Sequence, residues 1–129
     1  MKHILIIASY GPSLINFRIS LITKLISKGH KVSVASPREN FTDDLQKKIK
    51  DLGITINFFS LSRTSLNFFR DLKTIKEIFK IIKNSKPDMI ISYTAKPVIY
   101  TGLILKYFTK INYFPLITGL GFAFTESHL

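Results

Sequence analysis

The sequence contains no cysteine, and its few histidines stand far apart, at His3, His30 and His128. Disulfide bridges and cysteine-based metal sites are therefore excluded, and the histidines lack the spacing that zinc ligands share. No apolar run approaches the roughly 20 residues that a membrane-spanning helix needs. Acidic residues are also scarce, because 19 Lys and Arg residues face 8 Asp and Glu residues, giving a net charge of +11. That charge indicates an anionic partner, which is a nucleic acid, an anionic lipid or a phosphorylated ligand.

The first 29 residues predict a strand, a tight turn and a helix. Residues 3–8 form an isoleucine-rich apolar run without alternation, which is typical of a strand covered on both faces. Residues 9–13 carry turn chemistry, and the apolar residues from Leu14 then follow a helical period until Gly29 ends it. In α/β sheets, ligands bind where a strand ends and the next helix begins. Residues 9–18, SYGPSLINFR, are therefore the first candidate site.

Strands and helices are expected to alternate along the rest of the chain. The pattern predicts strands at 31–36, 54–59, 89–93 and 111–117, and helices at 42–52, 68–84 and 98–109. Pro115 weakens the last strand or places it at a sheet edge. Such alternation predicts a single α/β domain over residues 1–129, with a parallel sheet of about five strands and helices on both faces. The order of the strands stays open.

The expected carboxyl ends of these strands carry no carboxylate. They offer Ser9, Ser36, Ser60, Tyr93 with Thr94, and Thr118. A phospho-accepting receiver domain needs acidic Mg²⁺ ligands at these ends, and a dinucleotide site needs GxGxxG and an acid after the second strand. The P-loop signature GxxxxGK[ST] is also missing. Nucleotide-dependent redox chemistry and ATP hydrolysis are therefore excluded.

What remains at this edge is a rim of hydroxyls, amides, glycines and cations. Helix N-termini point at such a rim, and their free N–H groups favour anions. The chemistry suits a phosphorylated or sugar-bearing ligand without a tightly held metal. Each residue can also be an ordinary turn residue or a solvated side chain, and no catalytic residue is identified. The candidate binding residues are Gly11, Ser13, Asn16, Arg18, Arg63, Thr64, Tyr93, Thr94, Lys96, Thr118, Gly119 and Gly121.

The helix expected at residues 68–84 carries two stripes. Its apolar side chains recur at spacings of a single helical face, and four lysines form a neighbouring stripe. The apolar stripe is Phe68, Leu72, Ile75, Phe79 and Ile82, and the lysines are Lys73, Lys76, Lys80 and Lys83. A solvated face is the ordinary explanation of such lysines, and contact with an anionic surface is the other.

Five segments, in this order, resemble the N-terminal domain of bacterial GT-B glycosyltransferases, and most closely the GT4-like enzymes of capsule, O-antigen and glycan assembly. They are IIASYGPSLINFR, KGHKVSVASP, RTSLN, KPDMIISYTAKPVIYTGL and PLITGLGFAFT, and they cover essentially the whole chain. The resemblance implies two Rossmann-like domains that face a cleft. The N-terminal domain would mainly hold the acceptor, and the C-terminal domain would mainly hold a nucleotide-sugar donor.

The implied reaction is sugar transfer from a nucleotide-sugar to an acceptor that is often linked to a lipid diphosphate. No cofactor or metal is expected, because cations and helix dipoles stabilise the departing nucleotide diphosphate. The turn at Gly11 and the segments SYTAKP and TGLGFAF are expected to face the cleft. The donor-binding domain does not occur in these residues, so we expect a truncated product, one part of a split transferase or an excised domain. Alone it should lack transferase activity.

The resemblance also implies a role for the positive charge, which is contact with an anionic membrane surface. We expect a cytoplasmic protein that lies peripherally on the anionic inner face of the membrane, through Phe68, Phe69, Lys73, Lys76, Lys80 and Lys83. An alternative is a non-catalytic subunit that recruits a separate catalytic subunit to the membrane. A nucleic-acid-binding module is not expected, because the chain lacks an aromatic stacking motif and a helix-turn-helix, and its helices are needed to cover the sheet.

Overall fold

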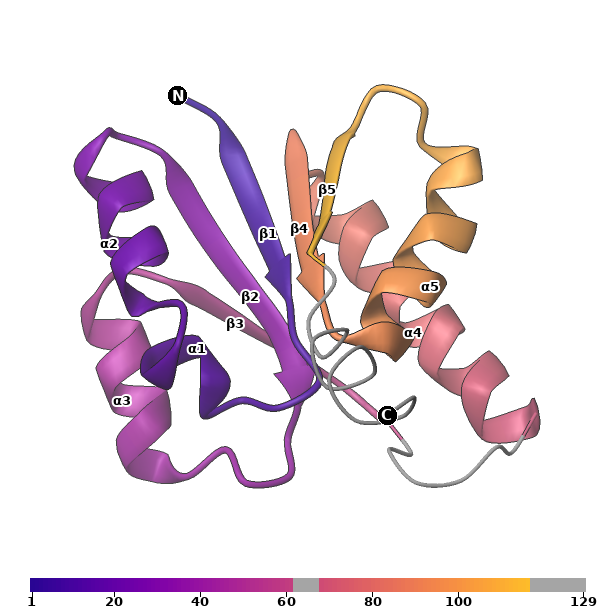
Figure 1. Ribbon diagram of the computed structural model, residues 1–129, viewed down its shortest axis with the longest axis horizontal. Helices are drawn as coiled ribbons and strands as arrows, with labels where there is room; N and C mark the ends of the chain where they lie inside the picture. The colour runs from indigo at the N-terminus through magenta and orange to yellow at the C-terminus, as the bar shows by residue number, and fades with distance from the viewer. Residues whose placement is uncertain (62–67, 117–129) are drawn as a thin grey trace, which may run out of the picture.

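The computed structural model describes residues 1–61 and 68–116, and these build a five-stranded parallel sheet (Figure 1). The strands are β1 (His3–Ile7), β2 (Lys31–Pro37), β3 (Thr55–Phe59), β4 (Met89–Tyr93) and β5 (Asn112–Leu116). They lie in the order β3-β2-β1-β4-β5, and each neighbouring pair is parallel. Pro115 therefore lies in an edge strand, as the sequence predicts. The Rossmann-like α/β fold class is confirmed.

Helices cover both faces of the sheet. One face carries α1 (Ser13–Asn16), α2 (Ile19–Ser27) and α3 (Asp43–Asp51), and the other carries α4 (Phe68–Ser85), α5 (Ala95–Ile104) and the 3-10 helix η1 (Leu105–Tyr107). Each face has its own apolar core. In β1, Ile4 and Ile6 belong to the core under α2 and α3, whereas Leu5 and Ile7 belong to the core under α4 and α5. This double burial explains why the first strand shows no polar alternation.

The first helix is broken where the sequence predicts a continuous one. Phe17 and Arg18 leave the helical conformation, with φ of −123° and −117°, and separate α1 from α2. The prediction of one helix is wrong here, since two residues outside the helical conformation interrupt the apolar period. The break places the Arg18 guanidinium over the ring of Tyr93, 4.5 Å from its centroid. The first turn thereby becomes part of the sheet's carboxyl edge.

The helix predicted at 98–109 starts earlier and ends earlier, as α5 followed by η1. Pro97 is compatible with this start because it stands in the first turn, where a backbone N–H has no partner within the helix. The bounds of α4 agree closely with the prediction, but its buried line differs from the predicted apolar stripe. The buried side chains are Thr74, Ile78 and Ile82. The sheet covers only part of the apolar surface, and Phe68 and Leu72 remain exposed.

Candidate functional site

The topology of the sheet marks one place for a ligand. From β1 the chain builds outward through β2 and β3 on one side, and β4 then returns to the other side of β1. The connections that follow β1 and β4 therefore diverge at the same edge, which is where open α/β sheets form their binding crevice. A hydrogen bond joins the two connections, because Thr94 Oγ1 donates to Ser9 Oγ at 2.8 Å. The hydroxyls of Ser9 and Thr94, which the sequence predicts at strand ends, thus lie together.

A second group at this edge is formed by Ser13, Tyr93 and Arg18. Ser13 Oγ donates to the Tyr10 carbonyl at 2.6 Å and lies 2.7 Å from the Tyr93 hydroxyl. Since Ser13 has only one hydroxyl proton, Tyr93 donates to Ser13. Arg18 stacks on the face of the same tyrosine ring, in the geometry of a cation–π contact. Tyr93 is almost fully buried, so it holds its two neighbours in place rather than presenting a free hydroxyl.

This arrangement leaves a positive charge at the crevice. Burial raises the pKa of Tyr93, while the Ser13 hydrogen bond and the Arg18 charge act in the opposite direction. Tyr93 is therefore neutral at physiological pH and does not neutralise the guanidinium. Among the described residues, Arg18 forms no salt bridge, and its buried Nε has no hydrogen-bond partner. A guanidinium fork without a carboxylate partner is suited to a phosphate or carboxylate ligand.

Gly11 and Asn16 have different surroundings. Gly11 is buried, and a Cβ atom added to it would lie 2.4 Å from Cδ2 of Phe41. The glycine is thus required by packing, whether or not its backbone also meets a ligand. Asn16 is exposed at the end of α1, where its amide is accessible.

The β4–α5 connection forms the other wall of the crevice. Thr94 has φ 69° and ψ 157°, a region that is essentially restricted to glycine. Next to it, Lys96 helps to line a cavity of about 190 Å³ that also touches Ser9 and Leu61. A neighbouring cavity of about 230 Å³ shares Leu61 and adds the cation Arg70. Both cavities are therefore lined by hydroxyls and cations.

Lys96 has a partner that the sequence did not reveal. Its Nζ lies 3.5 Å from Oδ1 of Asp71 in the first turn of α4, and the Tyr100 hydroxyl donates to the same oxygen at 2.7 Å. The Asp71 carboxylate and burial raise the pKa of Tyr100 to about 12, with burial the larger cause. Neither Asp71 nor Tyr100 was a candidate, because residues 29 positions apart carry no local signal of contact. The only sequence signal for Asp71 was its place in the first turn of a predicted helix, where acidic residues are favoured.

Five candidates, Arg63, Thr64, Thr118, Gly119 and Gly121, lie outside the described residues. The roles of the other seven stay predictions. Five of them lie together at the carboxyl edge of the sheet, namely Ser13, Arg18, Tyr93, Thr94 and Lys96. Across residues 1–61 and 68–116, no three His, Cys, Asp or Glu side chains are grouped so as to hold a metal ion.

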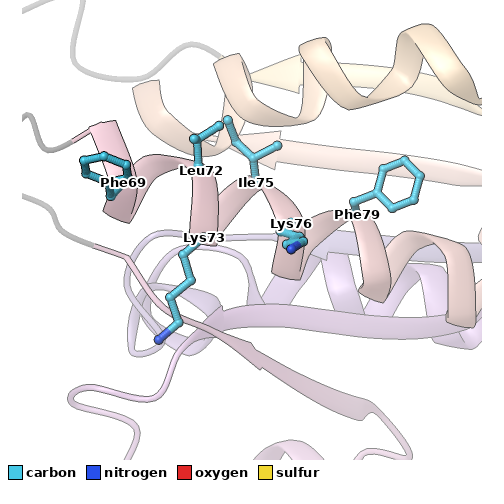
Figure 2. Close-up of a pocket in the computed structure, with 6 residues that line it drawn as sticks. All are labelled: Phe69, Leu72, Lys73, Ile75, Lys76 and Phe79. Atoms are coloured by element: carbon cyan, nitrogen blue, oxygen red, sulfur yellow. The ribbon is translucent and has the colours of Figure 1, made fainter.

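The outer side of α4 is a separate feature. All four predicted lysines are exposed there, as are Phe68 and Phe69. A groove of about 580 Å³ runs along this side, lined by Phe69, Leu72, Lys73, Ile75, Lys76 and Phe79. Figure 2 shows Leu72 and Ile75 pointing to the side of α5, whereas Lys73 points the opposite way. No helix in the described part of the chain is long and apolar enough to cross a membrane.

Known proteins resemble this chain in sequence and in fold. A family model described as glycosyl transferase 4-like matches residues 3–128. A Campylobacter jejuni protein named N,N'-diacetylbacillosaminyl-diphospho-undecaprenol alpha-1,3-N-acetylgalactosaminyltransferase is 34% identical over 112 residues, which cover 86% of this chain and 28% of that protein.

Solved structures agree on the fold. MurG of Acinetobacter baumannii aligns with a TM-score of 0.65 at 19% identity, over 91% of this chain and 33% of its own. A glycosyltransferase from Rickettsia africae aligns with a TM-score of 0.63 at 18% identity, over 88% of this chain and 29% of its own. This chain spans about a third or less of the length of these proteins. The resemblance to GT4-like enzymes is confirmed, and the chain belongs to the glycosyl transferase 4-like family.

Proposed function

We propose that this chain is the acceptor-binding half of a glycosyltransferase that moves a sugar from a nucleotide-sugar to a lipid-linked glycan in cell-surface polysaccharide biosynthesis. The observation that carries the proposal is Arg18, whose guanidinium is held at the crevice by Tyr93 and has no carboxylate partner among the described residues. A lipid-linked glycan acceptor carries a diphosphate, which matches that charge. The name of the Campylobacter jejuni relative includes a diphospho-undecaprenol group, which supports this acceptor class.

The residues at the crevice divide this task between them. Arg18 would form charge-assisted hydrogen bonds with a phosphate group, and Lys96 would contribute a second positive charge. Ser9, Thr94 and Asn16 are suited to hydrogen bonds with sugar hydroxyls. Cations and helix N-termini would stabilise a departing nucleotide diphosphate without a metal ion. The donor would be held by a further domain or subunit that faces this crevice.

The proposed location is the cytoplasmic face of the membrane. An acceptor with a lipid tail stays in the bilayer, so its enzyme must lie against the surface. Phe68, Phe69 and the lysine stripe of α4 are exposed and suited to this contact, because lysines close to an anionic leaflet contribute about 1 kcal/mol each.

A binding experiment tests the crevice. The ¹⁵N-labelled chain is titrated with a short-chain, water-soluble prenyl-diphosphate sugar, and chemical shifts are followed by NMR. We expect saturable shifts around residues 9–18 and 93–97, and Arg18→Gln should weaken binding at least tenfold. Arg38→Gln is the matched control, because Arg38 also stacks on a ring, that of Phe58 at 4.1 Å, but follows β2, which is not one of the two strands whose connections form the crevice.

Equal affinity of the Arg18 and Arg38 variants would reject the assigned role of Arg18. Shifts confined to other surfaces would reject the crevice itself. Titration with the corresponding glycan that lacks the diphosphate shows whether the phosphate or the sugar is recognised.

A further inference from the structure

A third cavity lies at the carboxyl edge of the sheet, beyond the two that adjoin the crevice. Its volume is about 400 Å³, and it lies at the ends of β2 and β3, against the middle of α4. Arg38, Glu39, Phe58 and Glu77 are among the residues that line it. It is larger than either of the cavities beside the crevice, which have volumes of about 190 and 230 Å³. We call it the distal cavity.

The three cavities meet at one residue. Leu61, which follows β3, lines all of them, and Ser60 lines both the distal cavity and the cavity of about 230 Å³. In the sheet, β4 lies on one side of β1, whereas β2 and then β3 lie on the other. Neighbouring strands are about 4.8 Å apart, so the end of β3 lies about 10 Å from the end of β1. The run of cavities is therefore longer than a single sugar ring.

The charge changes along this run. Among the described lining residues, the charged ones beside the crevice are all cations, including Lys96 and Arg70. The distal cavity is instead lined by two carboxylates, those of Glu39 and Glu77, together with Arg38. A diphosphate is therefore favoured at the crevice and disfavoured beside the carboxylates. Carboxylate acceptors next to a guanidinium donor are suited to the hydroxyl groups of an uncharged sugar.

The polar groups of the distal cavity are held in place or left available. Glu77 accepts hydrogen bonds from the backbone N–H of Ser60 at 2.7 Å and from its hydroxyl at 3.0 Å. The Arg38 guanidinium is positioned by the ring of Phe58. Within residues 1–61 and 68–116, neither Arg38 nor Glu39 takes part in an ion pair. Groups that are already positioned lose little conformational entropy when they bind a ligand.

We propose that the distal cavity holds a further sugar of the acceptor, so that this chain takes a lipid-linked glycan of two or more uncharged sugars. This inference rests on the proposed function, in which Arg18 binds the diphosphate in the crevice. The glycan would extend from the crevice past Leu61, with its terminal sugar between Arg38 and Glu39 on one side and Glu77 on the other. The acceptor class is thereby narrowed from any lipid-linked glycan to an oligosaccharide.

Two ligands of different length test this inference. The ¹⁵N-labelled chain is titrated with a water-soluble prenyl diphosphate that carries one uncharged sugar, and with one that carries an uncharged trisaccharide beginning with the same sugar. We expect the trisaccharide to bind about fivefold more tightly, which corresponds to about one added net hydrogen bond. It should also shift the amide signals of residues 38–39 and 58–60, which the single sugar leaves unchanged.

Variants locate the added affinity. Glu39→Ala removes an exposed carboxylate of the distal cavity, so it should weaken binding of the trisaccharide about fivefold and leave binding of the single sugar unchanged. Asp51→Ala is the matched control, because Asp51 is an exposed acid at the end of α3, on the other face of the sheet from α4. It should bind both ligands as the wild-type chain does. Arg38→Gln should weaken binding of the trisaccharide only, since the single sugar ends in the crevice.

The outcomes separate this inference from the proposed function. If the single sugar binds at the crevice and the trisaccharide binds no more tightly, the inference is wrong and the proposed function stands. If the trisaccharide binds more tightly but Glu39→Ala and Asp51→Ala have equal affinities for it, the added sugars bind elsewhere and the inference is again wrong. If neither ligand binds, the proposed function fails and the inference fails with it.

Discussion

The Tyr100 hydroxyl donates to Asp71 across 2.7 Å and thereby ties α5 to the first turn of α4. The bond joins the helix that carries Lys96 to the helix that carries the exposed lysine stripe. It also keeps the Asp71 carboxylate between a phenol and an ammonium group, 3.5 Å from the latter.

Tyr100→Phe should therefore destabilise the chain by about 1.5 kcal/mol, the usual value for a hydrogen bond to a charged group. The dependence on pH has a definite sign. The pKa of Tyr100 is raised to about 12 from 10.0, so the folded state favours the protonated phenol. Its contribution is complete below about pH 10 and is lost as the pH rises towards 12. Urea unfolding of both proteins from pH 8 to 11.5 should show their stabilities converging, and a constant difference would contradict the assignment.

Gly11→Ala should destabilise the chain by about 2 kcal/mol, because the added methyl group overlaps the Phe41 ring. Gly102→Ala is the control. Gly102 lies within α5 with open space around its Cα, so alanine should stabilise the chain by up to about 1 kcal/mol through its helix propensity. Thermal unfolding of the two variants should show midpoints that move in opposite directions.

Two substitutions at Thr94 separate its backbone from its hydroxyl. Thr94→Val keeps the strained conformation and removes the bond to Ser9, so it should cost about 1 kcal/mol. Thr94→Gly also loses the bond but relieves strain of about 1–3 kcal/mol. The glycine variant should therefore be the more stable of the two in chemical denaturation. The reverse order would show that the backbone is not strained.

The purified 129-residue chain should show no transfer of sugar from a nucleotide-sugar to a prenyl-diphosphate acceptor. The reason is that the proposed donor site belongs to a further domain. A radiolabelled donor and product extraction give the needed sensitivity, and a full-length family member serves as the positive control. Sugar transfer by the chain alone would contradict the division of roles between the two domains.

Much of the fold could be predicted, because its main determinants are local. Thr42 stands before two acids, and it caps α3 by accepting a hydrogen bond from the Leu45 amide. The five apolar runs are all strands. The break after Asn16 could not be predicted, since Leu14 and Ile22 continue the helical period across it, and the tyrosine ring that Arg18 contacts at the break is 75 positions away.

The candidate site was predictable to the extent that topology alone brings strand ends together. Ser9 and Thr94 both follow strands, so the sequence places them at the same edge of the sheet, but their contact depends on β1 and β4 being neighbours, an order that the sequence left open. The pairing of Lys96 with Asp71 depends on how α4 and α5 lie against each other, which no sequence period encodes. Phe68 and Phe69 were expected on the outer side of α4, but the exposure of Leu72 was not, because a helical stripe does not reveal how much of it the sheet will cover.

The shared position of β1 has a consequence for biosynthesis. Ile4 pairs with Val32 on one side and with Met89 on the other, so the strand made first waits for a partner made much later. Until β4 leaves the ribosome, one edge of an isoleucine-rich strand remains open to other chains. Long-range parallel pairing of this kind is slow to form. High expression without chaperones should therefore favour aggregation of this protein through its first strand.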